Sequence, residues 1–154
     1  MKQFLRKVIV GSVLLFAFVA ASFADVEQVD NNALQALIDK GVPVVDVRRI
    51  DEWQATGIID GVHTLTFFDK EGRYDAERWL EALDKIAPKG TPVVLICAAG
   101  VRSKSIAALL DKRLGYSGVH NHTKGMNDWL KAGMPVIKYT PESAGSAGSE
   151  DKVD

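Results

Sequence analysis

The sequence of 154 residues contains a single cysteine and only three histidines, which limits the chemistry that its side chains can perform. One cysteine cannot form a disulfide within the chain, so its thiol is either sheltered or kept for chemistry with another molecule. His120 and His122 alternate on an expected strand and would share one face. Two histidines alone do not complete a metal site, so we expect no metal and no other cofactor.

The chain also lacks an excess of basic residues, with 19 Lys and Arg against 20 Asp and Glu. Surfaces that bind nucleic acids are basic and patterned, so we expect no nucleic-acid partner. The sequence shows no internal repeat, no coiled-coil heptad and no phosphate-binding Gly-Lys-Ser/Thr motif. Its 47% hydrophobic and 25% charged residues are typical of one globular domain.

The first 24 residues are expected to be removed from this domain. Three basic residues precede an apolar run from Val8 to Ala21, and Ser22-Phe23-Ala24 follows, which is the pattern of a secretory signal peptide cleaved near Ala24. The alternative is a retained membrane anchor, although the run is short for a span. Without this segment 16 basic residues remain against 20 acidic ones, a net charge of −4. We therefore expect a periplasmic or secreted protein, and no later stretch is apolar enough to cross a bilayer.

Strand and helix patterns alternate through residues 25–139, the expected domain. Short apolar runs with the character of strands lie at 26–29, 42–47, 62–68, 93–96 and 119–121. Helices are expected between and after them, ending near Gly41, Gly57, Ala87, Gly115 and Lys131. This alternation predicts an α/β fold with a parallel sheet and helices on both faces. From Thr140 the composition shifts to Ser, Gly, Ala and acidic residues, which predicts a disordered tail over 140–154.

The stretch from Val93 to Leu110 carries the candidate chemistry. An apolar strand leads into Cys97, a loop of small residues follows, and an apolar-periodic helix comes next. In parallel sheets ligands bind at the carboxyl ends of strands, where this pattern places Cys97. The first N–H groups of a helix lack intrahelical partners, so they form an anion site that favours a thiolate over a thiol. The alternative is an inert core cysteine, which would need neither Gly100 nor Arg102 shortly after it.

Three separated blocks of the chain carry a family resemblance. They are Val44-Val45-Asp46-Val47-Arg48 with Glu52-Trp53 and Gly57, the loop Cys97–Ser103, and Gly125–Trp129 with Ala132–Val136. In this order, and over roughly residues 29–137, they resemble the rhodanese-like sulfurtransferases. The resemblance implies a rhodanese-like fold with a central, mostly parallel five-stranded sheet. The chain departs from the family pattern at two places. Where the family has Gly-His-Ile, this chain has Gly57-Ile58-Ile59, without the histidine. Where the family has Gly-Gly before the last block, this chain has Lys124-Gly125.

The resemblance also implies a reaction. Cys97 would take a sulfane sulfur from a small anionic donor such as thiosulfate, and a thiol or cyanide acceptor would then discharge the persulfide. The loop expected to bind the persulfide consists of Ala98, Ala99, Gly100, Val101, Arg102 and Ser103. Its small neutral residues leave room for the sulfur, and Arg102 would hold the loop through carbonyls or acidic residues, assist an anionic donor, or be a surface arginine. We expect a monomer that can also meet a thiol of a partner protein.

Supporting residues come from the first block. Asp46 is expected to make a structural salt bridge or hydrogen bond near the loop, since a buried carboxylate must be paired. Arg48 and Arg49 either line the mouth and attract anionic donors or lie on the solvated surface. Glu52-Trp53 are expected to be packing and helix-surface residues.

The alternatives to a sulfurtransferase share the same nucleophile. Cysteine phosphatases and arsenate reductases of related fold have five residues between cysteine and arginine, whereas Ala98 to Val101 are four. The smaller ring suits one sulfur atom better than a tetrahedral oxyanion. A periplasmic persulfide carrier, or a module that binds a redox partner without turnover, remains a second reading because it needs the same thiol.

Overall fold

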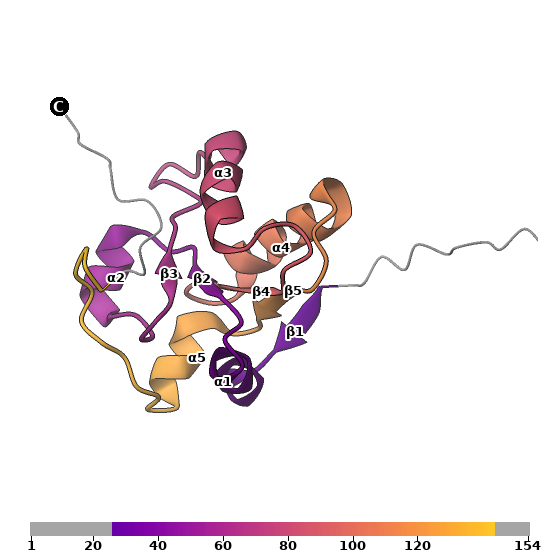
Figure 1. The fold of residues 1–154 in the computed structure, drawn as a ribbon. Helices are drawn as coiled ribbons and strands as arrows, with labels where there is room; N and C mark the ends of the chain where they lie inside the picture. Colours follow the sequence, from indigo (N-terminus) through magenta and orange to yellow (C-terminus); the bar gives the residue numbers. More distant parts are fainter. Residues whose placement is uncertain (1–25, 144–154) are drawn as a thin grey trace, which may run out of the picture.

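The computed structural model describes residues 26–143 (Figure 1). Its five strands are β1 (Glu27–Val29), β2 (Val44–Asp46), β3 (His63–Thr64), β4 (Val93–Ile96) and β5 (Val119–His122). They form one sheet in the order β1-β5-β4-β2-β3, and every pair is parallel. The predicted parallel five-stranded sheet is therefore confirmed. β4, which leads into Cys97, lies at its centre.

The five helices divide between the two faces of the sheet, as predicted. α3 (Ala76–Ile86) and α4 (Val101–Leu114) pack on one face, and α1 (Asn31–Asp39), α2 (Ile50–Thr56) and α5 (Gly125–Lys131) on the other (Figure 1). Alternate residues of β4 serve the two cores: Leu95 packs toward α3 and α4, and Ile96 toward α1, α2 and α5. Burial on both sides explains why this strand is an unbroken apolar run.

The predicted strand over 62–68 is shorter in the structure. Regular pairing covers His63–Thr64. Beyond it, the N–H of Leu65 donates to the carbonyl of Asp46, and the N–H of Phe67 donates to the carbonyl of Val47, which follows β2. The reason is the aromatic pair Phe67 and Phe68, whose rings both contact Tyr74. Neighbouring residues of a regular strand point to opposite faces, so this joint packing does not fit a regular strand at these two residues.

The final extended piece lies against the loop after α2. Ile137 and Ile58 form an isolated antiparallel bridge with two hydrogen bonds of 2.8 and 3.0 Å. Tyr139 then packs on Trp53, with ring centroids 5.2 Å apart. Residues 140–143 form a turn, and the rest of the predicted tail lies outside the described residues, as does the predicted signal peptide. Between residues 26 and 143 no helix has the length and apolar character that a bilayer crossing requires.

Candidate functional site

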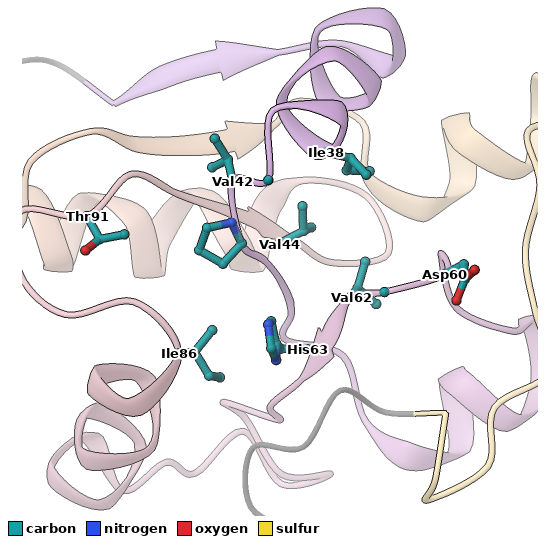
Figure 2. A pocket seen from close by; sticks show the side chains of 11 residues that line it. Ile38, Val42, Val44, Asp60, Val62, His63, Ile86 and Thr91 are labelled. Atoms are coloured by element: carbon teal, nitrogen blue, oxygen red, sulfur yellow. The ribbon is translucent and has the colours of Figure 1, made fainter.

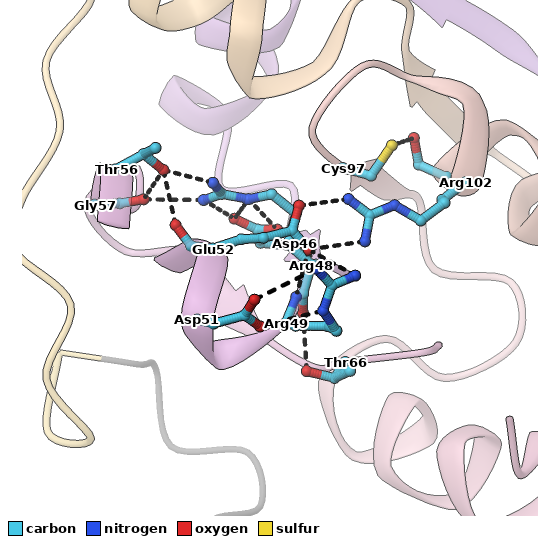
Figure 3. Close-up of polar contacts among 11 residues, drawn as sticks. Asp46, Arg48, Arg49, Asp51, Glu52, Thr56, Gly57, Thr66, Cys97 and Arg102 are labelled. Atoms are coloured by element: carbon cyan, nitrogen blue, oxygen red, sulfur yellow. Dashed lines mark hydrogen bonds and ion pairs between the residues drawn. The ribbon is translucent and has the colours of Figure 1, made fainter. Parts of the chain in front are cut away.

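Cys97 lies directly after β4, at the carboxyl edge of the sheet where the sequence placed it (Figure 3). The residue is 1% exposed, so the surrounding residues cover almost all of its surface. The hydroxyl oxygen of Ser103 is 3.3 Å from Sγ of Cys97 and 3.3 Å from the carbonyl of Gly100. The single hydroxyl proton can be donated to either, and a charged acceptor makes the stronger bond. Ser103 is thus positioned to stabilise an anionic sulfur.

The loop that follows Cys97 presents backbone donors without partners. Among the described residues, no hydrogen bond uses the N–H groups of Ala98, Ala99 or Gly100. The first N–H groups of α4, which begins at Val101, have no intrahelical acceptor either. Several unpartnered donors in succession beside a sulfur atom form a concave anion site of the kind that helix N-termini and backbone nests provide.

Two glycines let this loop pack closely against the chain around it. Gly100 has φ +80°, and a Cβ on it would collide with the carbonyl of Thr123. Gly125 has φ +63°, and a Cβ there would overlap the carbonyl of Cys97. Both positions require the left-handed conformation and the absence of a side chain. The loop is therefore held against the end of β5 and the start of α5.

The N-terminus of α5 anchors the loop by hydrogen bonds. The N–H of Met126 donates to the carbonyl of Cys97 at 2.8 Å, and that of Asn127 donates to the carbonyl of Ala98 at 2.9 Å. These contacts use the loop carbonyls and leave its N–H groups unengaged. Sequence reasoning did not assign a role to Met126 or Asn127. The only signal was their place in the block that begins at Gly125.

Arg102 is the second anchor of the loop (Figure 3). Its Nη1 donates to Oε2 of Glu52 at 2.9 Å, and its Nη2 donates to Oε1 at 2.6 Å. This two-pronged pair joins the first turn of α4 to the first turn of α2. The prediction that Arg102 bonds an acidic residue is confirmed. Glu52, expected to be a packing and helix-surface residue, is in addition the partner of Arg102, a role that the sequence did not predict. Trp53 beside it is buried, as expected.

The surroundings of Glu52 keep its carboxylate ionised. Burial raises the pKa of Glu52, but the hydrogen bonds from Arg102 and from the backbone N–H of Arg49, with the two guanidinium charges, outweigh burial and lower it below its ordinary value. The hydrogen bond to Glu52 in turn raises the pKa of Arg102, against the effect of burial, and the charges of Glu52 and Cys97 add to the rise. The pair is therefore fully charged at neutral pH.

Asp46 and Arg48 form a second, buried ion pair. Arg48 Nη2 lies 2.7 Å from Oδ2 of Asp46, and the side chains are 2% and 1% exposed. The same guanidinium donates to Oγ1 of Thr56 at 2.7 Å and to the carbonyl of Gly57 at 2.9 Å. The predicted structural pairing of Asp46 is confirmed. Both alternatives for Arg48, the mouth and the solvated surface, are wrong, because Arg48 turns inward and ties β2 to the C-terminus of α2.

Three further residues that the sequence singled out lie at or near the surface. Ala99 is exposed, and Val101 is 71% exposed as the first residue of α4. Arg49 is partly exposed and pairs with Asp51 at 3.1 Å and with Glu52 at 3.4 Å. Arg49 is therefore at the surface but does not carry an unpaired charge.

Two other features lie apart from this loop. A cavity of about 570 Å³ opens at the amino end of β2, lined by Pro43, Val44 and His63 among others (Figure 2). It contains none of the predicted site residues. His122 is buried and its Nε2 is 2.8 Å from Oδ1 of Asn31, and burial lowers the pKa of this histidine although Asp128 and Asp30 raise it. Across residues 26–143 no three His, Cys, Asp or Glu side chains gather as metal ligands do.

Comparison with known proteins connects this geometry to a family. The model of the Rhodanese-like domain matches residues 30–132. Thiosulfate sulfurtransferase GlpE of Actinobacillus succinogenes is 40% identical over 45 residues, which are 29% of this chain and 40% of that protein. The chain thus matches well under two thirds of the length of this curated relative.

Solved structures share the fold. Rv0390 of M. tuberculosis superposes with a TM-score of 0.60 at 22% identity, covering 74% of this chain and 99% of that one. The polysulfide-sulfur transferase homodimer of Wolinella succinogenes gives a TM-score of 0.57 at 22% identity, covering 77% and 82%. At these identities the likeness establishes a common fold.

Proposed function

The chain belongs to the rhodanese-like domain family, and from this membership we propose that it is a sulfurtransferase that carries a sulfane sulfur on Cys97. The observation that carries the proposal is the loop itself. The only cysteine of the sequence begins a turn whose N–H groups have no other acceptor within the described residues. A bound anionic sulfur would satisfy these donors, and no other residue type in the loop is a nucleophile except Ser103.

The reaction is two displacements at sulfur. The thiolate of Cys97 attacks the outer sulfur of a donor such as thiosulfate, a new S–S bond forms, and sulfite leaves with the electron pair of the broken S–S bond. An acceptor, cyanide or a thiolate, then attacks the outer sulfur of the persulfide, and Cys97 leaves as a thiolate. Each step balances without a cofactor or a redox partner.

The donors of the loop and its anchor Arg102 have different parts in this scheme. The N–H groups of Ala98, Ala99 and Gly100 would bind the negatively charged outer sulfur, and the Ser103 hydroxyl would donate to the inner one. Because the donors are fixed before the sulfur arrives, little reorganisation is needed when charge develops. Arg102 acts from outside this ring as a positioning residue, since its two terminal nitrogens are engaged by Glu52.

The same engagement argues against a phosphatase or arsenate reductase. Such enzymes need the loop arginine to bind two oxygens of a tetrahedral anion. Here Glu52 holds the two-pronged edge that Nη1 and Nη2 of Arg102 form, and the loop is one residue shorter. Sulfur transfer is the reaction that fits this arrangement.

A steady-state assay tests the proposal. With thiosulfate and cyanide, the protein should form many equivalents of thiocyanate per cysteine, and Cys97→Ser should form none because a hydroxyl is far less nucleophilic. A single equivalent and no more would favour the persulfide carrier over the enzyme. Thiocyanate formation by Cys97→Ser at the wild-type rate would overturn the proposal.

We also propose that the protein acts in the periplasm or after secretion, as a monomer. The support is the pattern of Lys2, Arg6 and Lys7, an apolar run and Ser22-Phe23-Ala24, which favours cleavage near Ala24. Mass analysis of the protein isolated from its source should show a chain that begins near Asp25. A full-length, membrane-bound form would contradict this. Light scattering of the cleaved chain tests the monomer.

A further inference from the structure

The most buried of the three histidines, His122, lies directly before the segment that packs on the Cys97 loop. It is the last residue of β5 and is 0% exposed. The next residue, Thr123, has its carbonyl against Gly100 of the loop. A polar ring without contact to water costs free energy unless its nitrogens find partners. The partners of this ring therefore show what it does in the fold.

One hydrogen bond determines the tautomer of His122. Its Nε2 lies 2.8 Å from Oδ1 of Asn31, the first residue of α1. Nδ2 of Asn31 donates to Oδ2 and to the backbone carbonyl of Asp128, at 3.1 and 3.3 Å, so the amide turns its oxygen toward the histidine. That oxygen can only accept, so Nε2 of His122 carries the proton. Nδ1 carries a lone pair and is buried, with no hydrogen-bond partner in the described part of the chain.

These three residues, His122, Asn31 and Asp128, form a network that ends on the helix anchoring the Cys97 loop. The helices α1 and α5 lie on the same face of the sheet (Figure 1), and Asn31 holds Asp128 of α5 by its carboxylate and its carbonyl. Met126 and Asn127, directly before Asp128, donate their N–H groups to two carbonyls of the loop, at 2.8 and 2.9 Å. Fixing Asp128 therefore fixes the direction of these two donors.

A second proton on the imidazole does not fit this network. It would place a positive charge and an N–H without an acceptor at a site that is 0% exposed. Burial lowers the pKa of His122, whereas the charges of Asp128 and Asp30 raise it. Lys124 lies 4.0 Å from Asp128 and weakens that attraction. Of the neighbouring strands, β4 has no charged side chain, and Glu27 of β1 is 68% exposed.

Building on the proposed function, we infer that His122 is a positioning residue: its neutral form holds α5 against the Cys97 loop through Asn31 and Asp128, and its protonation loosens this hold. An opening that admits water lets the imidazole titrate near its ordinary value of about 6.5. The stabilisation by the neutral ring is complete above this pH and is lost as the pH falls below it. At pH 5.5 the open form becomes up to about tenfold more populated than at pH 7.5.

Hydrogen exchange of the Met126 and Asn127 amides, followed by NMR, tests the hold without any sulfur chemistry. Each rate is divided by the intrinsic rate of an unstructured peptide at the same pH, which removes the pH dependence of exchange itself. Protection of both amides should fall about three- to tenfold from pH 7.5 to 5.5. The amide of Leu95, at the centre of the sheet, should stay more protected at each pH, because the opening is local. Protection of Met126 and Asn127 that does not change with pH, or that equals the protection of Leu95, would overturn the inference.

Variants separate the hydrogen bond from the charge. His122→Gln keeps an N–H donor near the place of Nε2 but does not titrate, so its protection should remain at the wild-type value for pH 7.5 at both pH values. His122→Leu leaves Oδ1 of Asn31 without a donor, so its protection should be about fivefold or more lower at both. The matched control is His120→Gln, since the side chain of His120 is 13% exposed and lies 3.1 Å from Glu27, and it should keep the wild-type pH dependence. A pH dependence that survives in His122→Gln, or an imidazole ¹⁵N spectrum of the wild type with the proton on Nδ1, would contradict the inference.

Loading of Cys97 by thiosulfate connects the network to sulfur transfer. At pH 7.5 His122→Leu should load about threefold or more slowly than the wild type, because its loop is less well positioned, and His122→Gln should restore loading to within twofold. Wild-type loading by a His122→Leu protein with reduced protection would overturn the positioning role and leave the sulfurtransferase proposal standing. No loading by the wild type would overturn the proposed function, whereas hydrogen exchange would still decide whether His122 holds the loop.

Discussion

Arg102 and Glu52 are 50 residues apart in sequence, yet two hydrogen bonds of 2.9 and 2.6 Å join them. One residue lies in the first turn of α4, directly after the Cys97 loop, and the other lies in the first turn of α2. The pair therefore fixes the loop relative to the neighbouring strand connection. It also holds the edge of the guanidinium formed by Nη1 and Nη2 on the carboxylate of Glu52.

Replacing Arg102 with Ala should slow sulfur loading of Cys97 by about 10- to 10³-fold, comparable to the loss of one stabilising donor in other enzymes. The thiol and the loop N–H groups remain, but the loop loses its tie to α2. Arg102→Lys should recover only part of the rate, since an ammonium cannot reproduce the two-pronged geometry. Arg113→Ala, at the exposed C-terminal end of α4, is the matched control and should load normally. Wild-type loading by Arg102→Ala would show that the pair does not position the loop.

Two adjacent arginines should differ sharply in their effect on folding. Arg48→Ala leaves the carboxylate of Asp46 buried and unpaired, so we expect the free energy of unfolding to fall by about 3–5 kcal/mol. Arg49→Ala removes a partly exposed pair and should cost less than about 1 kcal/mol. Urea denaturation of the two variants measures both values. Similar losses would mean that the Asp46–Arg48 pair is not the buried interaction described above.

Gly100→Ala should lower the melting temperature by more than the strain of a positive φ alone would cause. Its Cβ would strike the carbonyl of Thr123, whereas Gly61, with φ +74°, has no atom within 4 Å of an added Cβ. Gly61→Ala therefore pays only the left-handed penalty, on the order of 1 kcal/mol. Thermal melting should show the larger loss for Gly100→Ala, and its sulfur loading should fall while that of Gly61→Ala is kept. Equal losses of melting temperature and of sulfur loading in Gly100→Ala and Gly61→Ala would mean that the carbonyl of Thr123 does not lie against Gly100.

The Glu52 carboxylate should contribute to the acid sensitivity of the fold. Its pKa lies below the ordinary 4.5, so the folded state favours the ionised form, and the resulting stability is present above about pH 4.5 and is lost as the pH falls through the lowered value. The urea midpoint of Glu52→Gln should be below that of the wild type near pH 7, and the two should converge toward pH 3. Glu81→Gln, an exposed change on α3, should follow the wild type throughout. A constant difference between Glu52→Gln and the wild type would exclude this linkage.

The sheet and the position of Cys97 were predictable because local patterns determine them. Unbroken apolar runs mark strands buried on both sides, and a small-residue turn before a helix marks the functional end of β4. The need to pair a buried carboxylate also predicted the partnering of Asp46. The inward turn of Arg48 was not predictable, because the acceptors at Thr56 and Gly57 come together only after α2 has packed.

The residues that anchor the loop could not be predicted from the sequence for a similar reason. Glu52 and Arg102 have the helix-surface pattern of ordinary charged residues, and only the parallel pairing of β2 with β4 brings their helices side by side. The anchoring role of Met126 and Asn127 cannot be predicted from their side chains, since it uses the backbone N–H groups that almost every residue type has. Gly125 was the one visible sign, because a glycine before a helix can mark a close backbone approach.

The central claim is that Cys97 accepts a sulfane sulfur, and intact-mass spectrometry after exposure to a sulfur donor tests it most directly. The wild-type protein should gain about 32 Da, one sulfur atom, and should lose it again on addition of cyanide or dithiothreitol. Cys97→Ser should show no such gain. An unchanged wild-type mass after millimolar thiosulfate or alkyl persulfide, together with alkylation by iodoacetamide no faster than that of free cysteine, would contradict the claim and make Cys97 a structural residue.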